Sequence, residues 1–251
     1  MQDLSSILSS FSPISLEEMD HVKLLDRIDT KFMIHEEQLP EYLAAVNTEY
    51  SLLRIKGELV HPYETLYFDT PDYNLYKMHH NGRRNRFKLR CRKYVNSGIV
   101  YFEIKSKTNT RRTVKKRMRV ENIPETLGNK LNQYINEHTT GNFHDFVPVL
   151  RVFFDRLTLV NKQANERLTI DLNLRYQHDG IEKKIEKIAI VEVKQEKHSI
   201  SPFRQLMKKR RQQNNYLSKY CLGLICLIKG IKMNRFQQKI NELTKLGYDL
   251  Y

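Results

Sequence analysis

The sequence predicts an antiparallel α+β fold in which about eight strands, enough to close a β-barrel, are covered by helices. Three observations lead to this prediction. Apolar and polar residues alternate with a period of two in many segments, which is the pattern of β-strands. Several helical segments accompany these strands and need apolar strand faces to pack on. In many of the strands the polar side of the alternation is charged, so one sheet face is expected to carry many cations.

The composition fits a single domain over residues 1–251 that has an anionic partner. The chain has 251 residues with 43 Lys plus Arg and 29 Asp plus Glu, which gives a net charge of +14. This excess of cations favours nucleic acid, a phosphorylated metabolite or an acidic membrane surface, and does not choose among them. The sequence contains no Gly- or Pro-rich linker that would divide the chain.

The cysteines and the apolar segments predict a cytoplasmic protein. Cys91, Cys221 and Cys226 form no CxxC pair and no Cys/His ligand set, so neither a disulfide framework nor a zinc site is indicated. Residues 1–11 lack the basic segment and the long apolar core of a signal peptide. The most apolar run, residues 220–228, is much shorter than the roughly 20 residues that a helix needs to span a bilayer.

The first part of the chain alternates short helices with strands. A helical lead-in is expected at residues 15–22, followed by a strand at 24–35. Residues 36–46 form a short helix with its proline near the first turn. Two further strands are expected at 50–56 and 63–70, and the second ends in the turn sequence Asp-Thr-Pro-Asp.

The middle of the chain predicts a hairpin and a third neighbouring strand. Residues 72–82 form one or two helical turns that stop at a glycine. The strands at 86–94 and 99–107 flank the turn Asn-Ser-Gly and are expected to pair. Another strand follows at 113–121, and residues 122–138 are expected to be helical.

The last part of the chain continues with strands and ends in helices. Strands are predicted at 149–160 and 166–174, followed by a pair of strands at 181–187 and 188–196. The expected C-terminal helices, the first of them capped by a serine, are 201–213, 215–228 and 236–246.

Cations occupy every second position of the strand RFKLRCRKY, at Arg86, Lys88, Arg90 and Arg92. The same alternation recurs in four other strands. The charged residues that share a face in these strands are Arg27, Asp29 and Lys31; Glu103, Lys105 and Lys107; Lys115, Arg117 and Arg119; and Glu192, Lys194 and Glu196. The positions between them are largely apolar, so each strand has one charged and one apolar face.

Two arrangements of these charged faces are open. If the helices cover the apolar faces from outside, the charged faces point inward. An unpaired buried charge costs several kcal/mol, so such an interior is expected to be a wet tunnel built for a polyanion. The alternative is an open sheet whose basic face is solvated or binds nucleic acid. The period of the pattern does not decide between them because it does not tell which face is inside.

The segments that carry this pattern resemble the catalytic domain of the vacuolar transporter chaperone (VTC) family, polyphosphate polymerases of the CYTH-like triphosphate tunnel metalloenzyme superfamily. The resemblance covers roughly residues 24–228, in the family's order. It implies an eight-stranded antiparallel barrel, the triphosphate tunnel, with helices packed outside. It also implies binding of ATP and a metal, and transfer of the γ-phosphoryl group to a growing polyphosphate chain. The similar segments are RIDTKF, YFDTPDYNLY, KLRCRKY, FEIKSK, VKKRMR, VLRVFFDR, ERLTIDLN, VEVK and SKYCLG.

The resemblance also implies the site residues. Glu192 corresponds to the metal-binding glutamate, with Glu103 and Glu196 as candidate helpers, and Mn²⁺ or Mg²⁺ is the implied cofactor. Lys116 and Arg117 are alternatives for one basic position. The implied catalytic residues are Lys31, Arg90, Arg92, Lys105, Lys194 and Lys219. The implied substrate-binding residues are Lys88, Lys107, Lys116, Arg117, Arg156 and Arg167.

The sequence departs from the family pattern at two places. Phe154 stands where the pattern has a tyrosine, so a hydroxyl contact is lost there. The basic residue expected between Tyr76 and Arg86 is not fixed. Its candidates are Lys77, His79, His80, Arg83 and Arg84, of which the two histidines are expected to lie on the surface.

Phosphoryl transfer depends mainly on positioning and charge stabilisation, for which arginine forks and lysine point charges are suited. The expected acceptor is the end phosphate of the polyphosphate chain, itself a nucleophile. Two other functions stay open, a triphosphatase of the same superfamily and a non-catalytic binder of polyphosphate or nucleic acid. Specific nucleic-acid binding is not expected, because Phe87, Phe102 and Phe153 alternate away from the cations. The oligomeric state and a membrane-protein partner are left open.

Overall fold

The computed structural model describes residues 3–21, 27–109, 113–141, 143–197, 199–214, 217–245 and 247. Its contacts divide the chain into two compact units. Unit 1 comprises residues 1–61, 154–174 and 185–216, and unit 2 comprises residues 62–153, 175–184 and 217–251. The prediction that residues 1–251 form one domain stays a prediction, and the two units are described in turn.

The strands confirm the prediction of an antiparallel β-sheet with helices. They correct the predicted number of strands and the predicted closure of the sheet into a barrel. The described residues form 11 strands rather than eight: β1 Ser12–Ile14, β2 Arg27–His35, β3 Tyr50–Leu53, β4 His61–Asp69, β5 Arg86–Tyr94, β6 Ile99–Lys107, β7 Thr113–Val120, β8 Val147–Asn161, β9 Glu166–His178, β10 Ile181–Ile185 and β11 Ile188–Glu196. Neighbours are hydrogen-bonded in the order β2-β11-β9-β8-β4-β5-β6-β7, while β3 pairs with β1 and β8, and β10 pairs with β9.

The predicted closed barrel is therefore wrong. The described residues of β2 and β7, the two ends of this order, do not pair with each other. Closure depends on strand tilt and stagger, which an alternation of side chains does not encode. The predicted pairing of the strands 181–187 and 188–196 is also wrong, because β11 pairs with β2 and β9 instead.

The helices largely follow the predicted segments. They are α1 Leu4–Ser9, α2 Leu16–His21, α3 Leu39–Ala44, α4 Asn74–His80, α5 Asn129–His138, α6 Pro202–Lys209, α7 Lys219–Leu227 and α8 Gln237–Lys245, with short 3-10 turns at Glu36–Gln38, Val95–Ser97 and Asn234–Phe236. The sequence does not predict α1. Within the described part of the chain, no helix combines the length and the apolar character needed to cross a membrane.

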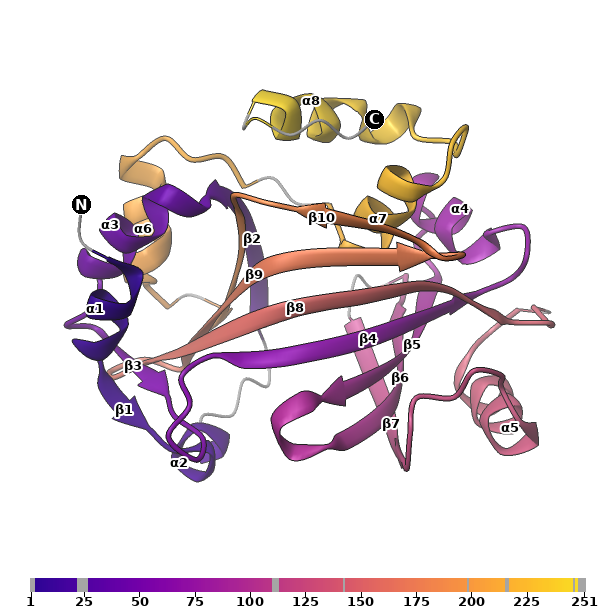
Figure 1. The fold of residues 1–251 in the computed structure, drawn as a ribbon, viewed down its shortest axis with the longest axis horizontal. Coiled ribbons are helices and arrows are strands. Elements are labelled where there is room, and N and C mark those ends of the chain that lie inside the picture. Colours follow the sequence, from indigo (N-terminus) through magenta and orange to yellow (C-terminus); the bar gives the residue numbers. More distant parts are fainter. Residues whose placement is uncertain are drawn as a thin grey trace. The chain divides into compact units, whose positions relative to one another are not determined.

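The core of unit 1 lies between three helices and one face of its strands. In Figure 1, α1, α3 and α6 lie together beside these strands. Val191 on β11 stands between Phe32 on β2 and Ile170 on β9. Phe203 on α6 meets the Phe32 ring edge-on, with the centroids 6.3 Å apart. The alternation therefore leaves the opposite face of these strands for Lys31, Glu192 and the other charged residues.

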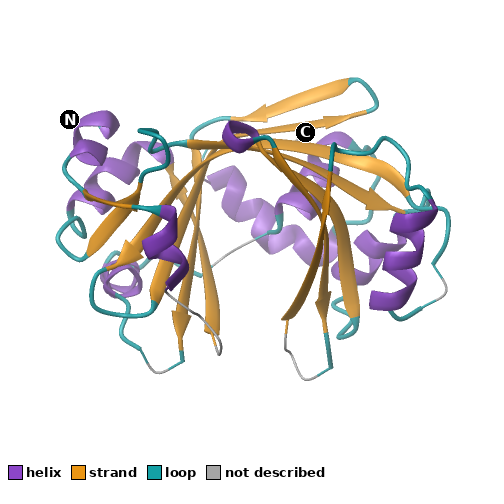
Figure 2. Ribbon diagram, turned by 90° about the horizontal axis from the view of Figure 1, so that it is seen from below, coloured by secondary structure: helices purple, strands orange, loops and turns teal. Residues whose placement is uncertain are grey.

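The core of unit 2 is built in the same way on β4, β5 and β6. Leu89 on β5 and Ile104 on β6 are direct cross-strand partners, and both are buried. Leu75 on α4 and Leu131 and Ile135 on α5 complete this cluster. Figure 2 shows helices against one face of the strands. The opposite face is again the charged one, so in each unit the helices cover the apolar side, as the sequence predicts.

Candidate functional site

The charged face of unit 2 is a grid of side chains on β4, β5, β6 and β7. The antiparallel register aligns Tyr67, Arg90, Glu103 and Arg117 in one row across the four strands. The next row toward one end holds Lys88, Lys105 and Lys115, and the next row toward the other end holds Thr65, Arg92, Tyr101 and Arg119. Because cross-strand partners lie about 5 Å apart, these cations form one continuous surface.

Glu103 is the counter-ion at the centre of this surface, and none of its side chain is exposed. Its Oε2 accepts from Arg90 Nε at 2.7 Å, and its Oε1 accepts from Lys115 Nζ at 2.8 Å. Burial opposes ionisation, but Arg90, Arg92 and Lys115 together hold the pKa of Glu103 well below its usual value. With both oxygens bound by cations and none of its side chain exposed, Glu103 organises the grid, and its role as a helper of the metal ligand stays a prediction.

Lys88 differs from Arg90 and Lys115 because it has no carboxylate partner among the residues that the structure describes. Its Nζ lies 5.9 Å from the centroid of the Tyr220 ring. Removal from solvent lowers the pKa of Lys88, and the neighbouring Arg90 and Arg86 lower it further. Such a site favours an anion from outside the protein, because unpaired charges away from water are costly.

Tyr67 shows how positive this surface is. Burial would raise the pKa of the Tyr67 hydroxyl, yet Arg90, Arg92 and Lys88 hold that pKa below its ordinary value. Tyr67 is not among the site residues predicted from the sequence. The sequence contains a pattern that could have predicted it, since Tyr67 and Thr65 alternate with apolar residues of β4.

The charged face of unit 1 is formed by β2, β11, β9 and β8. Glu192 stands between Lys31 on β2 and Thr169 on β9 in the register. One carboxylate oxygen of Glu192 pairs with Lys31 Nζ, and the other accepts from Lys194 Nζ at 2.9 Å. Burial lowers the pKa of Lys194. The predicted residues Lys31, Lys194 and Glu192 are therefore brought together.

Arg156 and Arg167 lie on the same strands and are held by acceptors of unit 1. Arg156 makes a bidentate ion pair with Asp171, in which Nε donates to Oδ1 at 2.6 Å and Nη2 donates to Oδ2 at 2.8 Å. Arg167 is the cross-strand partner of Lys194, and its Nη2 donates to the carbonyl of Met19 at 2.8 Å. Arg156 also lies over the ring of Phe154, 5.2 Å from its centroid, so the aromatic at the position where the resemblance implies a tyrosine contacts a predicted site arginine.

The described residues fit a metal ion only as a site with fewer than three protein ligands of the usual kinds. They contain no group of three His, Cys, Asp or Glu side chains that could hold a metal. The side chain of Glu192 is 16% exposed, and Glu196 accepts from Asn165 Nδ2 at 2.8 Å. Mg²⁺ is commonly bound by one or two carboxylates with substrate phosphates and water as the other ligands. Glu192 can supply that carboxylate once its lysine partners bind phosphate instead.

Lys219 is the first residue of α7, in unit 2. Ser218 caps this helix by accepting from the Cys221 N–H at 3.2 Å. The next side chain, Tyr220, donates its hydroxyl to the buried Asp69. Asp69 also accepts the backbone N–H groups of Leu75 and Tyr76 at the start of α4. Asp69 therefore binds the starts of α4 and α7 to the end of β4. The turn sequence Asp-Thr-Pro-Asp does not indicate this role.

The other predicted basic residues of unit 2 lie on both faces of the sheet. Lys105 and Lys107 lie on the charged face, where Lys107 is the partner of Arg86. Arg117 also lies there, with its guanidinium 4.6 Å from the centroid of Tyr101. Lys116 pairs with Ile104, so it belongs to the opposite, apolar face. Of the two alternatives for this position, the register puts Arg117 with the other cations.

The histidines His79 and His80 are not surface residues, in contrast to the expectation. His80 is almost fully buried, and its Nε2 accepts from the Arg235 N–H at 3.2 Å. His79 Nδ1 accepts from Arg86 Nε at 3.0 Å, and burial lowers the pKa of His79 to about 2. His79 is thus neutral and positions Arg86, so it does not supply the expected cation.

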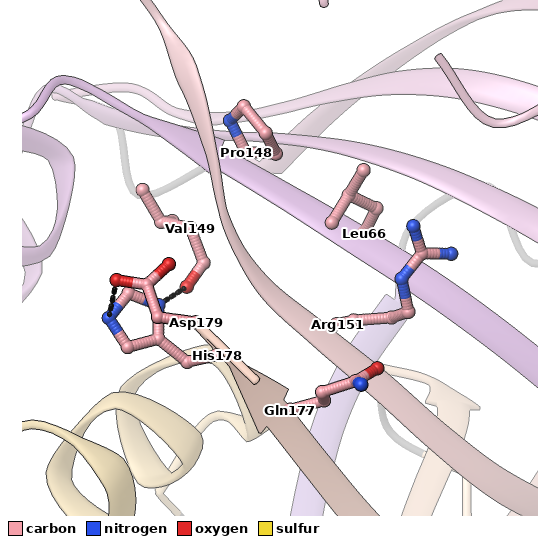
Figure 3. A pocket seen from close by; sticks show the side chains of 7 residues that line it. All are labelled: Leu66, Pro148, Val149, Arg151, Gln177, His178 and Asp179. Atoms are coloured by element: carbon pink, nitrogen blue, oxygen red, sulfur yellow. Dashed lines mark hydrogen bonds and ion pairs between the residues drawn. The ribbon is translucent and has the colours of Figure 1, made fainter. Parts of the chain in front are cut away.

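A pocket of about 310 Å³ in unit 2 lies away from these residues. Figure 3 shows His178 beside Val149, whose carbonyl is 2.8 Å from His178 Nδ1, and beside Asp179. Leu66 also lines the pocket and belongs to the apolar core cluster of unit 2. Because Leu66 alternates with Tyr67, this pocket is on the face of β4 opposite the cations.

The comparisons with known proteins identify one family. The family model described as "VTC domain" matches residues 26–228. A search of curated proteins found no match. The family model covers both charged faces and the start of α7, and so includes every predicted site residue.

The solved structures that this chain resembles have low sequence identity to it. A protein from Bacillus halodurans named "putative adenylate cyclase" is 15% identical, with 77% of this chain and 94% of that chain covered and a TM-score of 0.47. A Hippeastrum protein named "putative adenylyl cyclase", stated to have a dominant triphosphatase activity, is 13% identical, with 78% and 94% covered and a TM-score of 0.44. The family assignment depends on the family model.

Proposed function

This chain belongs to the VTC domain family, and we propose that it is a metal-dependent polyphosphate polymerase that transfers the γ-phosphoryl group of ATP to a growing polyphosphate chain. The observation that carries the proposal is Lys88. It is partly buried beside Arg90 and lacks a carboxylate partner among the described residues. A phosphate group supplies the negative charge that this position lacks.

The proposal assigns phosphate binding to the cations of both charged faces. On unit 2 these are Lys88, Arg90 and Lys105, and on unit 1 they are Lys31 and Lys194. The fork of Arg90 is already oriented by Glu103, and Lys194 is oriented by Glu192. Side chains that are held in place before the substrate arrives stabilise developing charge without reorganising during the reaction.

In the transfer step, a terminal oxygen of the polyphosphate chain attacks the γ-phosphorus of ATP, the bond from that phosphorus to the β–γ bridging oxygen breaks, and ADP leaves. No serine, cysteine or histidine nucleophile is needed, because the acceptor is itself an oxyanion. A bound Mg²⁺ or Mn²⁺, with Glu192 as its carboxylate ligand, would neutralise charge on the phosphate oxygens. Lys31 and Lys194 release Glu192 for this role when they bind phosphate oxygens.

The proposed location is the cytoplasm. Cys91, Cys221 and Cys226 are all free, and burial raises the pKa of Cys91 and of Cys226 to about 12. Thiols of this kind, without disulfide partners, are typical of proteins in a reducing compartment.

Turnover of ATP with Mn²⁺ or Mg²⁺ tests the proposal. Purified protein is expected to release ADP and to form long chains on a gel with little free phosphate. Glu192→Gln is expected to lower the rate at least about tenfold while polyphosphate binding remains, because a metal ligand is lost and no cation is removed. The matched control Glu182→Gln removes an exposed carboxylate that pairs with Arg175 at 3.0 Å and is expected to keep the rate.

Other products would contradict the polymerase. Equal amounts of ADP and free phosphate would mean that water is the acceptor and that the chain is a triphosphatase. Binding of polyphosphate with no turnover of any nucleotide would make it a non-catalytic binder, and Glu192→Gln would then have no rate to change.

A further inference from the structure

The charged face of unit 2 changes character toward the end of β5. Tyr63 on β4, Tyr94 on β5 and Tyr101 on β6 all lie on this face, because they alternate with core residues and share its register rows. Each of the three rings is partly exposed. Phe87 and Phe102, by contrast, belong to the apolar core cluster. The tyrosines are therefore the aromatics that accompany the cations.

The three rings form one contiguous cluster. The centroids of Tyr63 and Tyr94 are 5.0 Å apart, and those of Tyr94 and Tyr101 are 6.2 Å apart with the ring planes nearly perpendicular. Arg92 lies over Tyr63 at 5.4 Å, and Arg117 lies over Tyr101 at 4.6 Å. Aromatic rings flanked by arginine planes are the surfaces on which nucleobases stack, whichever base is present.

The cluster directly continues the proposed phosphate-binding residues. Along β5 the order is Lys88, Arg90, Arg92 and Tyr94, with about 7 Å between successive members of this series because alternate residues share a face. A nucleoside triphosphate has the same order, with three phosphates at one end and a base at the other. A base at Tyr94 leaves its phosphates beside Arg92, Arg90 and Lys88.

We propose that the tyrosine cluster formed by Tyr63, Tyr94 and Tyr101 binds the base of the nucleoside triphosphate substrate. This inference rests on the proposed function, since it takes the phosphates to bind at the adjacent cations. The tyrosines distinguish a nucleotide from inorganic phosphate chains, which have no base. The growing product therefore gains no affinity from these rings, whereas the incoming nucleotide does.

Tyr94 is the ring to remove, because it touches both other rings while the arginines cover Tyr63 and Tyr101. Tyr94→Leu leaves both arginine–ring contacts in place, and Tyr94→Phe keeps the ring and removes only the hydroxyl. Calorimetric titration with ATP and with inorganic triphosphate, both in EDTA so that neither is turned over, compares a ligand that has a base with one that does not.

ATP has a smaller negative charge than inorganic triphosphate, so charge alone predicts that ATP binds more weakly. The wild-type protein is expected to bind ATP more tightly than this difference in charge predicts. Tyr94→Leu is expected to weaken ATP binding at least about fivefold, the lower end of the effect of losing a stacking ring. Binding of inorganic triphosphate is expected to stay within about twofold, and Tyr94→Phe to bind ATP like the wild type. These results together support the base site.

Three results would overturn it. If Tyr94→Leu weakens both ligands equally, or weakens neither, the ring has a structural role only and the proposed function is untouched. If Tyr94→Phe weakens ATP binding as much as Tyr94→Leu does, the hydroxyl of Tyr94 and not its ring contributes to ATP binding. If the wild-type protein binds neither ligand, the proposed function fails and the base site fails with it.

Discussion

Glu103 is a fully buried carboxylate whose two oxygens are both taken by cations, Arg90 and Lys115. Its charge holds the cations of unit 2 in place and does not bind substrate. The register of β5, β6 and β7 sets the spacing of these cations. A buried charge with good partners costs little as long as every partner is present, and costs much when one is removed.

Glu103→Gln is therefore expected to lower the free energy of unfolding by about 3 kcal/mol, because the largely buried Arg90 loses its counter-charge. Urea denaturation followed by circular dichroism measures this. Adding inorganic triphosphate is expected to restore part of the loss, since its charge replaces that of the carboxylate.

The control for this change is Glu182→Gln, which removes an exposed ion pair with Arg175 in the same unit. It is expected to cost less than about 1 kcal/mol. Equal losses for the two variants would show that Glu103 does not act as a buried counter-ion.

Single residues also show what the sequence could not decide. The alternation within β7 placed Arg117 and Lys116 on opposite faces, and the pairing of Arg117 with Glu103 shows that the face of Arg117 joins the cations of the neighbouring strands. Similarly, Tyr67 and Asp69 lie in a recognisable motif, yet their contacts with Tyr220 are made across the fold and leave no local pattern.

The helix α7, which begins at the predicted site residue Lys219, packs closely against the sheet at Gly223. A Cβ atom at this position would come within 2.4 Å of the Tyr176 ring on β9 and 2.7 Å of Leu150 on β8. These are distances that side chains do not reach without displacement. The glycine of the segment SKYCLG is thus explained by packing, and the approach keeps Lys219 and Tyr220 beside the end of β4.

Gly223→Ala is expected to lower the free energy of unfolding by about 2 kcal/mol, as an overpacked core position does. Gly128→Ala is the matched control, because a Cβ there meets nothing within 4 Å. Its expected cost is less than about 1 kcal/mol, which reflects its place as the N-cap of α5. Thermal unfolding of the two variants compares them, and a control that is as unstable as Gly223→Ala would refute the packing argument.

Elements with strong alternation are the ones that the sequence predicts well. The bounds of β5 and β6 agree with the predicted strands at 86–94 and 99–107, because most residues in them follow the period of two. The helix expected at 122–138 begins only at Asn129, and the short elements α1 and β1 were missed. With six and three residues, α1 and β1 contain few turns or alternations from which a period can be recognised.

At the level of the molecule, the sequence predicts which sides of the strands are charged, but not how the sheet ends. The helices cover the apolar faces in both units, as expected from their need for an apolar surface. The closed eight-stranded barrel was an expectation from the family resemblance, and the strand order from β2 to β7 is open among the described residues. Edge pairing depends on stagger between distant segments, which local periodicity does not record.

The central claim is that the charged faces, and not the basic character of the chain as a whole, bind phosphates. The affinity for inorganic triphosphate, measured by calorimetry for Lys88→Met and Lys93→Met, tests it most directly. Both lysines lie on β5, with Lys88 on the charged face and Lys93 opposite Glu64 and Val100 on the other face. We predict that Lys88→Met weakens binding at least about tenfold and that Lys93→Met changes it less than about twofold, since a screened surface charge contributes little. Equal losses for the two variants would contradict the claim.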